Sequence, residues 1–165
     1  MDTVSDDVPI AYCERTPLFR DAEELVCVGR DVHGRDALLH PCAADAWTRM
    51  AAEAARRGLT LLIVSAFRSI QRQSEIVRRK RERGLSWEEI LRVSAYPGFS
   101  EHHTGCAVDV GSPLCCDLLE QFEKTEEFGW LTVHASEFSF SMSYPRGNPS
   151  GVIYEPWHWK WTDGG

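Results

Sequence analysis

The stretch that decides how this chain folds reads SEHHTGCAVD and runs from Ser100 to Asp109. Its end, Cys106 to Val110, has the small and β-branched residues of a short strand. His102 and Asp109 are seven positions apart, so on one uninterrupted strand they would face opposite sides. A bend must therefore lie between them. Gly105 can supply it, because glycine adopts backbone conformations that other residues avoid.

A second motif, EPWH at residues 155–158, supplies further polar groups. Together the two motifs offer two histidines, an aspartate and an additional glutamate. A catalytic zinc site uses three protein ligands, leaves one position for water and has a base nearby. Pro156 favours an extended conformation at Glu155. Glu155 therefore need not bind a metal together with His158, and it can lie beside a metal-bound water instead. Each motif alone is more often structural, and their combination favours a metal site.

Helical and strand patterns surround these motifs. The apolar spacing predicts a helix over residues 43–57, ended by Gly58, and a buried strand over 59–66. A helix is expected over 69–83, and residues 86–89 form a capping box that opens another short helix. Ser112 and Pro113 predict the start of a helix that runs to about Glu127.

The last third of the chain resembles a strand pair. Aromatic and small polar residues alternate there, and the turn between the strands is expected at residues 147–151. Trp157, Trp159 and Trp161 would share one strand face, as core or cleft wall. Because helices come early and hairpin strands late, we predict an α+β fold with helices packed on a small antiparallel sheet. Residues 1–165 would form a single domain, in which residues 1–40 are an irregular N-terminal segment.

Composition limits the function. A chain of 165 residues with a net charge of -7 fits one globular domain and disfavours a nucleic-acid partner. The basic run at residues 78–83 is expected to be the solvated face of a helix. No apolar stretch is long enough for a membrane span. The first seven residues lack a signal-peptide pattern, which favours a cytoplasmic protein. The six cysteines form no C-x-x-C pair and are expected to be small buried residues, although an even count permits disulfides.

The pattern S-x-H-x-x-G-x-A-x-D followed by E-P-W-H resembles the zinc D-alanyl-D-alanine carboxypeptidase family of the VanY type. The related D-Ala-D-Ala dipeptidases and L,D-carboxypeptidases share its fold. Three further stretches resemble regions of that family: SAFRS at residues 65–69 followed by Gln73, FGW at 128–130 and SYP at 143–145. The resemblance spans about residues 60–161, the motif-bearing core, and finds no counterpart for residues 1–40. It implies a hedgehog/D-Ala-D-Ala peptidase-like fold.

The resemblance also implies a role for each matching residue. One zinc ion per chain would be bound by His102, Asp109 and His158. Glu155 would activate the water, and Arg68 would stabilise the oxyanion, a role that suits a permanently charged guanidinium. Ser100 and Gln73 would contact the substrate, with Ser100 a candidate for its terminal carboxylate. The implied substrate is a peptidoglycan stem peptide or precursor that ends in D-Ala-D-Ala and loses its terminal D-alanine.

Several alternatives stay open. The same site could serve an L,D-carboxypeptidase or an endolysin-type peptidoglycan peptidase. A non-catalytic zinc-bearing binding module is disfavoured, because a zinc scaffold needs neither Glu155 nor Arg68. His103 could replace His102 as the ligand, although the offset to Gly105 and Asp109 favours His102, and His103 would then line the site. Cys106 could be a core residue or, less simply, an alternative soft ligand.

Overall fold

A four-stranded antiparallel sheet forms the centre of the molecule, with strand order β3-β4-β6-β5. The computed structural model describes residues 9–164. Its elements are, in chain order, α1 Ile10–Arg15, β1 Val26–Arg30, β2 Asp36–Leu39, α2 Pro41–Arg56, β3 Leu62–Ser65, α3 Ile70–Glu82, α4 Trp87–Val93, η1 Glu101–Thr104, β4 Ala107–Gly111, η2 Glu120–Lys124, α5 Glu126–His134, η3 Ala135–Phe138, β5 Phe140–Met142 and β6 His158–Trp161. The predicted α+β class is confirmed.

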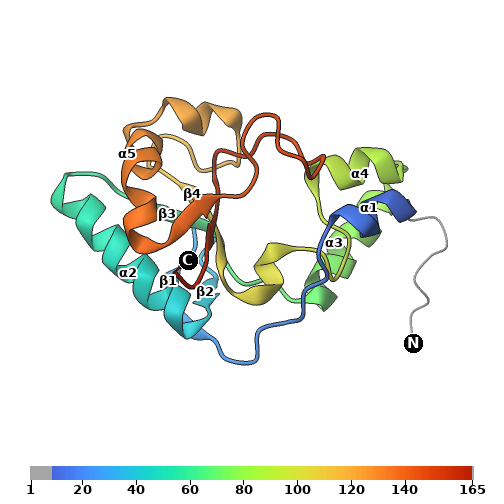
Figure 1. Ribbon diagram of the computed structural model, residues 1–165, viewed down its shortest axis with the longest axis horizontal. Coiled ribbons are helices and arrows are strands. Elements are labelled where there is room, and N and C mark those ends of the chain that lie inside the picture. Colours follow the sequence, from blue (N-terminus) through green and yellow to red (C-terminus); the bar gives the residue numbers. More distant parts are fainter. Residues whose placement is uncertain (1–8, 165) are drawn as a thin grey trace.

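The helices gather at two ends of the molecule (Figure 1). Helices α2 and α5 lie beside the sheet, whereas α1, α3 and α4 form a separate group at the other end. The hydrophobic core lies between α2 and the sheet, where Trp47 and Met50 of the helix are buried with Val108 of β4 and Trp159 of β6. Strand β4 is buried along its whole length and therefore forms the middle of this core.

The predicted helix boundaries are close to the observed ones. Helix α2 has Pro41 at its first position, and Arg57 follows its last residue. Helix α3 begins after Ser69, whose hydroxyl accepts a hydrogen bond from the Arg72 N–H. Helix α4 begins with the predicted capping box, in which Ser86 and Glu89 satisfy each other's backbone N–H groups.

The N-terminal region contains more regular structure than the irregular segment expected from the sequence. Within residues 9–40, the structure has the six-residue helix α1 and a hairpin of β1 and β2. The hairpin joins the rest of the fold through the Val32 N–H, which donates to the Ile63 carbonyl of β3 at 2.9 Å. Its turn depends on Asp31, whose carboxylate accepts from the backbone of His33 and Arg35.

The predicted helix from Ser112 to Glu127 is wrong. Ser112 closes a tight turn instead, because its hydroxyl and carbonyl both accept from the Cys115 N–H, and the Ser112 N–H donates to the Cys115 carbonyl. Leu118 then adopts a left-handed conformation with φ of 53°, which a continuing helix cannot include. The regular helix, α5, begins only after Thr125, whose hydroxyl accepts from the Phe128 N–H.

The predicted C-terminal strand pair is present as β5 and β6, but residues 143–157 between them form a long excursion rather than a short turn. Asn148 stabilises the outer part of this loop, because its side chain donates to the carbonyls of Pro145 and Val152. The inner part is tied together by the Glu155 N–H, which donates to the Tyr144 carbonyl at 3.0 Å. The loop thereby brings both residues beside the sheet.

None of the helices described within residues 9–164 is both long enough and apolar enough to cross a membrane.

Gly105 makes the predicted bend, and its replacement provides a test of it. Gly105 has φ of 69°, and an added Cβ would lie 2.8 Å from the backbone nitrogen of His40. Gly105→Ala should therefore lower the free energy of unfolding by about 2–5 kcal/mol, the sum of left-handed strain and a backbone clash. Gly34→Ala is the matched control, because Gly34 has φ of 77° with open space around it. It should lose only about 1–2 kcal/mol. Equal losses in denaturant unfolding would contradict the clash at Gly105.

Candidate metal centre and active site

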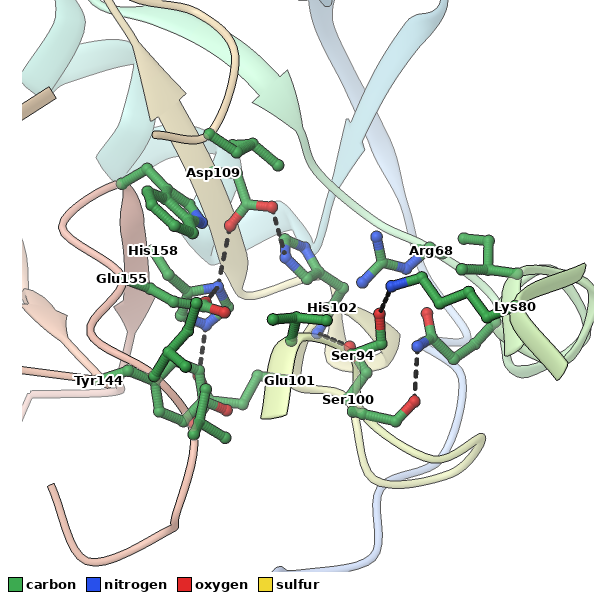
Figure 2. A pocket seen from close by; sticks show the side chains of 18 residues that line it. Arg68, Lys80, Ser94, Ser100, Glu101, His102, Asp109, Tyr144, Glu155 and His158 are labelled. Carbon is green, nitrogen blue, oxygen red and sulfur yellow. Dashed lines mark hydrogen bonds and ion pairs between the residues drawn. The ribbon is translucent and has the colours of Figure 1, made fainter. Parts of the chain in front are cut away.

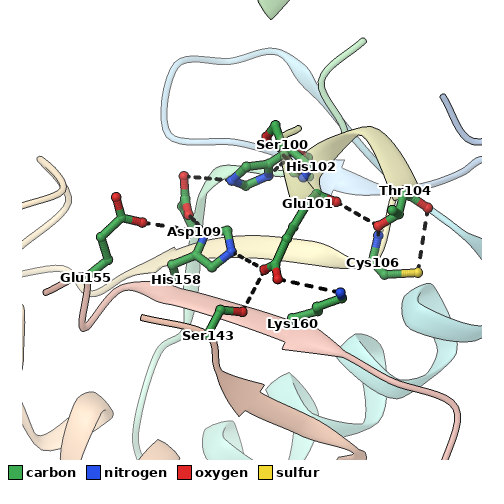
Figure 3. Close-up of polar contacts among 11 residues, drawn as sticks. Ser100, Glu101, His102, Thr104, Cys106, Asp109, Ser143, Glu155, His158 and Lys160 are labelled. Atoms are coloured by element: carbon green, nitrogen blue, oxygen red, sulfur yellow. Dashed lines mark hydrogen bonds and ion pairs between the residues drawn. The ribbon is translucent and has the colours of Figure 1, made fainter. Parts of the chain in front are cut away.

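Three buried side chains meet at one end of the sheet. His102 comes from η1, Asp109 from β4 and His158 from the first position of β6, where it is the cross-strand partner of Asp109. The Asp109 carboxylate lies between the two rings, 3.2 Å from His102 Nε2 and 2.9 Å from His158 Nδ1 (Figure 3). The three candidate ligand atoms lie within 4.8 Å of one another. The bend at Gly105 therefore brings His102 and Asp109 to the same point.

The outer nitrogen of each histidine ring is already committed to an acceptor. His102 Nδ1 lies 2.7 Å from the Ala66 carbonyl, to which it can only donate. His158 Nε2 lies 2.8 Å from a carboxylate oxygen of Glu101. In the neutral rings, the remaining nitrogens, His102 Nε2 and His158 Nδ1, therefore point lone pairs toward the Asp109 carboxylate. With both rings neutral, three electron-pair donors would converge on one point, which is the arrangement that a metal cation completes.

The acid–base properties of the three groups agree with this reading. Burial lowers the pKa of His102 and would lower that of His158, but hydrogen bonds with Asp109 and Glu101 raise the pKa of His158 to about 10. Burial would raise the pKa of Asp109, yet the two facing histidines hold it well below its usual range. A proton on His158 thus occupies the position that a metal ion would take. Two imidazoles and one carboxylate fit zinc with a fourth position open.

Glu101 is a functional residue that the sequence analysis missed. Its carboxylate accepts from His158 Nε2 and, at 2.6 Å, from the Ser143 hydroxyl, and Lys160 Nζ lies 3.5 Å away (Figure 3). Burial would raise the pKa of Glu101, but the His158 contact and the Ser143 hydroxyl lower it to about 2. Glu101 therefore fixes the tautomer and orientation of His158. Its position directly before His102 was the only signal in the sequence.

His103 has a different role from His102. Its Nδ1 donates to the Arg68 carbonyl at 2.6 Å, and its Nε2 accepts from the Gly98 N–H at 3.1 Å. Both ring nitrogens are thus used for structure. His103 does not belong to the candidate metal cluster, in agreement with the choice of His102, but it does not line the cavity either, contrary to expectation. Cys106 also lies apart from the cluster and packs against the core.

Glu155 and Arg68 lie beside the cluster without binding each other. A Glu155 carboxylate oxygen is 3.9 Å from His158 Nδ1, and burial raises the pKa of this carboxyl to about 7, although His158 opposes the shift. The Arg68 backbone is held on both sides by η1, through the His102 carbonyl and the His103 ring. Its Nε is buried without a hydrogen-bond partner. The Arg68 backbone is therefore fixed, and Nε of its guanidinium is available to an anionic group.

All the residues predicted for the site line one cavity of about 330 Å³ (Figure 2). Ser100 is buried in its wall, and its hydroxyl accepts from the His102 N–H at 3.3 Å. Gln73 is also buried, where its amide nitrogen donates to the Ala95 carbonyl while its oxygen has no partner. Tyr144, which belongs to the SYP stretch but was assigned no role from the sequence, packs with its ring centroid 4.9 Å from that of His158. Burial raises its pKa, so the phenol stays protonated.

Comparison with known proteins agrees with this geometry. The family model for D-alanyl-D-alanine carboxypeptidases of the VanY type matches residues 36–164. YodJ of Bacillus subtilis is 36% identical over 124 residues, which is 73% of this chain and 45% of that protein. The D-alanyl-D-alanine carboxypeptidase of Enterococcus faecium is 29% identical over 123 residues, which is 72% of this chain and 36% of the enzyme. The chain therefore spans less than half the length of these two relatives.

Solved structures share the fold. The LdcB LD-carboxypeptidase superposes with a TM-score of 0.79 at 28% identity, over 87% of this chain and 70% of the other. VanYB in complex with D-Ala-D-Ala has a TM-score of 0.69 at 23% identity, over 90% and 81%. A VanY D,D-pentapeptidase variant in complex with Zn(II) has a TM-score of 0.66 at 22% identity, over 96% and 84%, and at such identities the likeness concerns the fold alone. Because the family model covers most of its length, this chain belongs to the VanY family of D-alanyl-D-alanine carboxypeptidases.

Proposed function

We propose that this protein is a zinc-dependent carboxypeptidase that removes the terminal D-alanine from peptidoglycan-type peptides ending in D-Ala-D-Ala. One zinc ion per chain would be held by His102, Asp109 and His158. The observation that carries the proposal is their convergence, with the outer nitrogen of each ring already engaged. Membership of the family supports the reaction class, and the Zn(II) complex of a VanY neighbour supports the metal.

The chain's own residues would perform the remaining chemistry. When bound, zinc supplies a Lewis acid that polarises the scissile carbonyl and lowers the pKa of the attacking water. Glu155 would take the proton of that water and later transfer it to the leaving amine. Its raised pKa, about 7, suits a group that both accepts and returns a proton near neutral pH. Arg68 would meet the negative charge that develops on the carbonyl oxygen.

The likeness to LdcB favours a second candidate, an L,D-carboxypeptidase that uses the same site. Both candidates need room for the upstream residues of a peptide. A second cavity of about 410 Å³ adjoins the first and shares Arg68, Ile76 and Leu118 with it. It lies between the turn of the β1–β2 hairpin and the start of α3, and it would extend the site beyond a dipeptide.

The ligand assignment predicts which variants lose metal. Most of the zinc should be lost in each of three variants, His102→Ala, Asp109→Ala and His158→Ala, because two protein ligands bind zinc much more weakly than three. Elemental analysis of purified protein gives the content per chain, which should be close to one in the wild type. His134→Ala is the control, because His134 pairs with Glu137 on the surface. Full zinc content in all three site variants would refute the assignment.

Glu155→Ala separates metal binding from chemistry. The variant should keep its zinc and lose about 10²–10⁴-fold in turnover, the usual contribution of a general acid–base. Mass spectrometry of stem peptides ending in D-Ala-D-Ala or in a single D-Ala measures the reaction and distinguishes the two candidates. Wild-type turnover in this variant would leave Glu155 with a structural role only, and cleavage of neither peptide by the zinc-loaded wild type would contradict the proposed function.

Glu101→Gln tests the support of His158. In this variant His158 Nε2 would face an uncharged amide, which is a weaker acceptor than a carboxylate. Zinc affinity should therefore fall about 10–100-fold, as is typical when the partner of a metal-binding histidine is altered. Competition with a chelator measures the affinity without reference to activity. Glu137→Gln is the matched control, because it changes the same kind of glutamate–histidine contact far from the cluster. Unchanged affinity in Glu101→Gln would leave the contact without influence on the metal.

A further inference from the structure

Lys80 differs from the rest of the basic run to which it belongs. Arg78 and Arg79 are exposed on the outer face of α3, as the sequence predicts. Lys80 is half-buried and lines the same cavity as the metal cluster. Its ammonium group donates to the hydroxyl of Ser94, the residue that ends α4, and Ser94 lines the cavity as well. One cation of this run is therefore directed inward.

No carboxylate neutralises this cation. Within residues 9–164, neither Lys80 nor Arg68 has an acidic partner within ion-pair distance, although most other buried or half-buried charges at the site do. Burial lowers the pKa of Lys80, and the charge of Arg68 lowers it further. Figure 2 shows the Lys80 ammonium next to the Arg68 guanidinium, with Arg68 between it and His102. Two neighbouring desolvated cations repel each other, and an anion bound beside them would offset both the repulsion and the lost hydration.

Other polar groups on this wall also lack partners. Arg68 Nε and Gln73 Oε1 are buried without a hydrogen bond among the described residues. Ser100 uses its hydroxyl oxygen to accept from the His102 N–H, which leaves the hydroxyl proton available. The wall therefore presents three donors, the Lys80 ammonium, the Arg68 guanidinium and the Ser100 hydroxyl, beside one acceptor, Gln73 Oε1. Such a set is suited to a carboxylate.

We propose that Lys80, supported by Ser94, binds the free C-terminal carboxylate of the substrate and makes this site specific for the end of a chain. The inference rests on the proposed function and adds the group that recognises the terminus. In a carboxypeptidase substrate, the terminal carboxylate lies one residue beyond the scissile carbonyl, at most about 3.6 Å along the chain. Two anionic groups so close need two adjacent cations. Arg68 beside the cluster meets the oxyanion, and Lys80 beyond it meets the carboxylate.

The assignment also explains why an internal peptide bond would be a poor substrate. An endopeptidase substrate places an uncharged amide where the carboxylate would lie. The Lys80 ammonium would then stay desolvated without an anion, which costs binding energy. This wall consequently disfavours the endolysin-type alternative, whereas D,D- and L,D-carboxypeptidases both satisfy it.

The test compares a peptide ending in D-Ala-D-Ala with the same peptide carrying a C-terminal amide. The zinc-loaded wild type should favour the free acid in kcat/KM on the order of 10–100-fold, the loss expected for one hydrogen bond to a charged group. Lys80→Met should lose this factor on the acid and little on the amide, so that the preference approaches one. Lys80→Arg should keep a substantial part of it, because the charge remains.

Arg79→Met is the matched control, because it removes the neighbouring cation from the exposed face of the same helix, and it should retain the full preference. A second arm measures binding of both peptides to zinc-loaded Glu155→Ala, with and without Lys80→Met, and does not depend on turnover. An undiminished preference for the acid in folded, zinc-loaded Lys80→Met would overturn the proposal. Failure of the wild type to cleave either peptide would instead count against the proposed function, while the binding arm would still decide the role of Lys80.

Discussion

The buried carboxylate of Asp109 is the constraint on which the rest of the structure depends. It lies in the middle of the fully buried strand β4, pairs across one edge with Ser65 of β3 and across the other with His158 of β6. A carboxylate at such a position is costly unless charged or hydrogen-bonding partners surround it. One ring, His102, comes from η1 directly before β4, whereas the other, His158, comes from β6 far along the chain. Pairing of β4 with β6 therefore also brings the second histidine to the carboxylate.

A single short segment, η1, connects this carboxylate to the catalytic groups. It carries His102 toward the cluster and Glu101 toward the outer side of His158, while the His102 carbonyl and the His103 ring hold the backbone of Arg68. The contacts of Glu101, His102 and His103 thus all depend on one turn, which ends at the left-handed Gly105. These contacts fix the backbone of Arg68 beside the cluster, while Nε of its guanidinium has no hydrogen-bond partner among the described residues.

The sequence contained enough information for the fold class and for the residues that the structure brings together. Local rules located α2, α3 and the capping box of α4, because apolar spacing and caps act within a few residues. The same rules failed at Ser112 and Pro113, which resemble a helix start but form a turn. Backbone hydrogen bonds join Ser112 to Cys115, and Leu118 has a left-handed conformation that no helix continues through. Glu101 and Tyr144 were missed for a related reason. Their partners lie on β6 and in its preceding loop, and no spacing rule reports such contacts.

The placement of charged side chains shows the same limit of sequence-based prediction. The chain carries a net charge of -7, yet its site presents Arg68 and Lys80 toward the cavity while the cluster beside them holds Asp109, Glu101 and Glu155. A zinc ion bound on the carboxylate side would offset two of its three negative charges, and the proposed anionic substrate end would then meet the two cations. The sequence shows six consecutive residues at 78–83, four arginines, one glutamate and the single lysine Lys80, but it does not show which of the cations is buried. The packing of α3 beside α4 directs the Lys80 ammonium into the cavity, whereas Arg78 and Arg79 face water. Burial, which the composition of the run does not show, therefore separates the cation proposed to recognise the substrate from its neighbours.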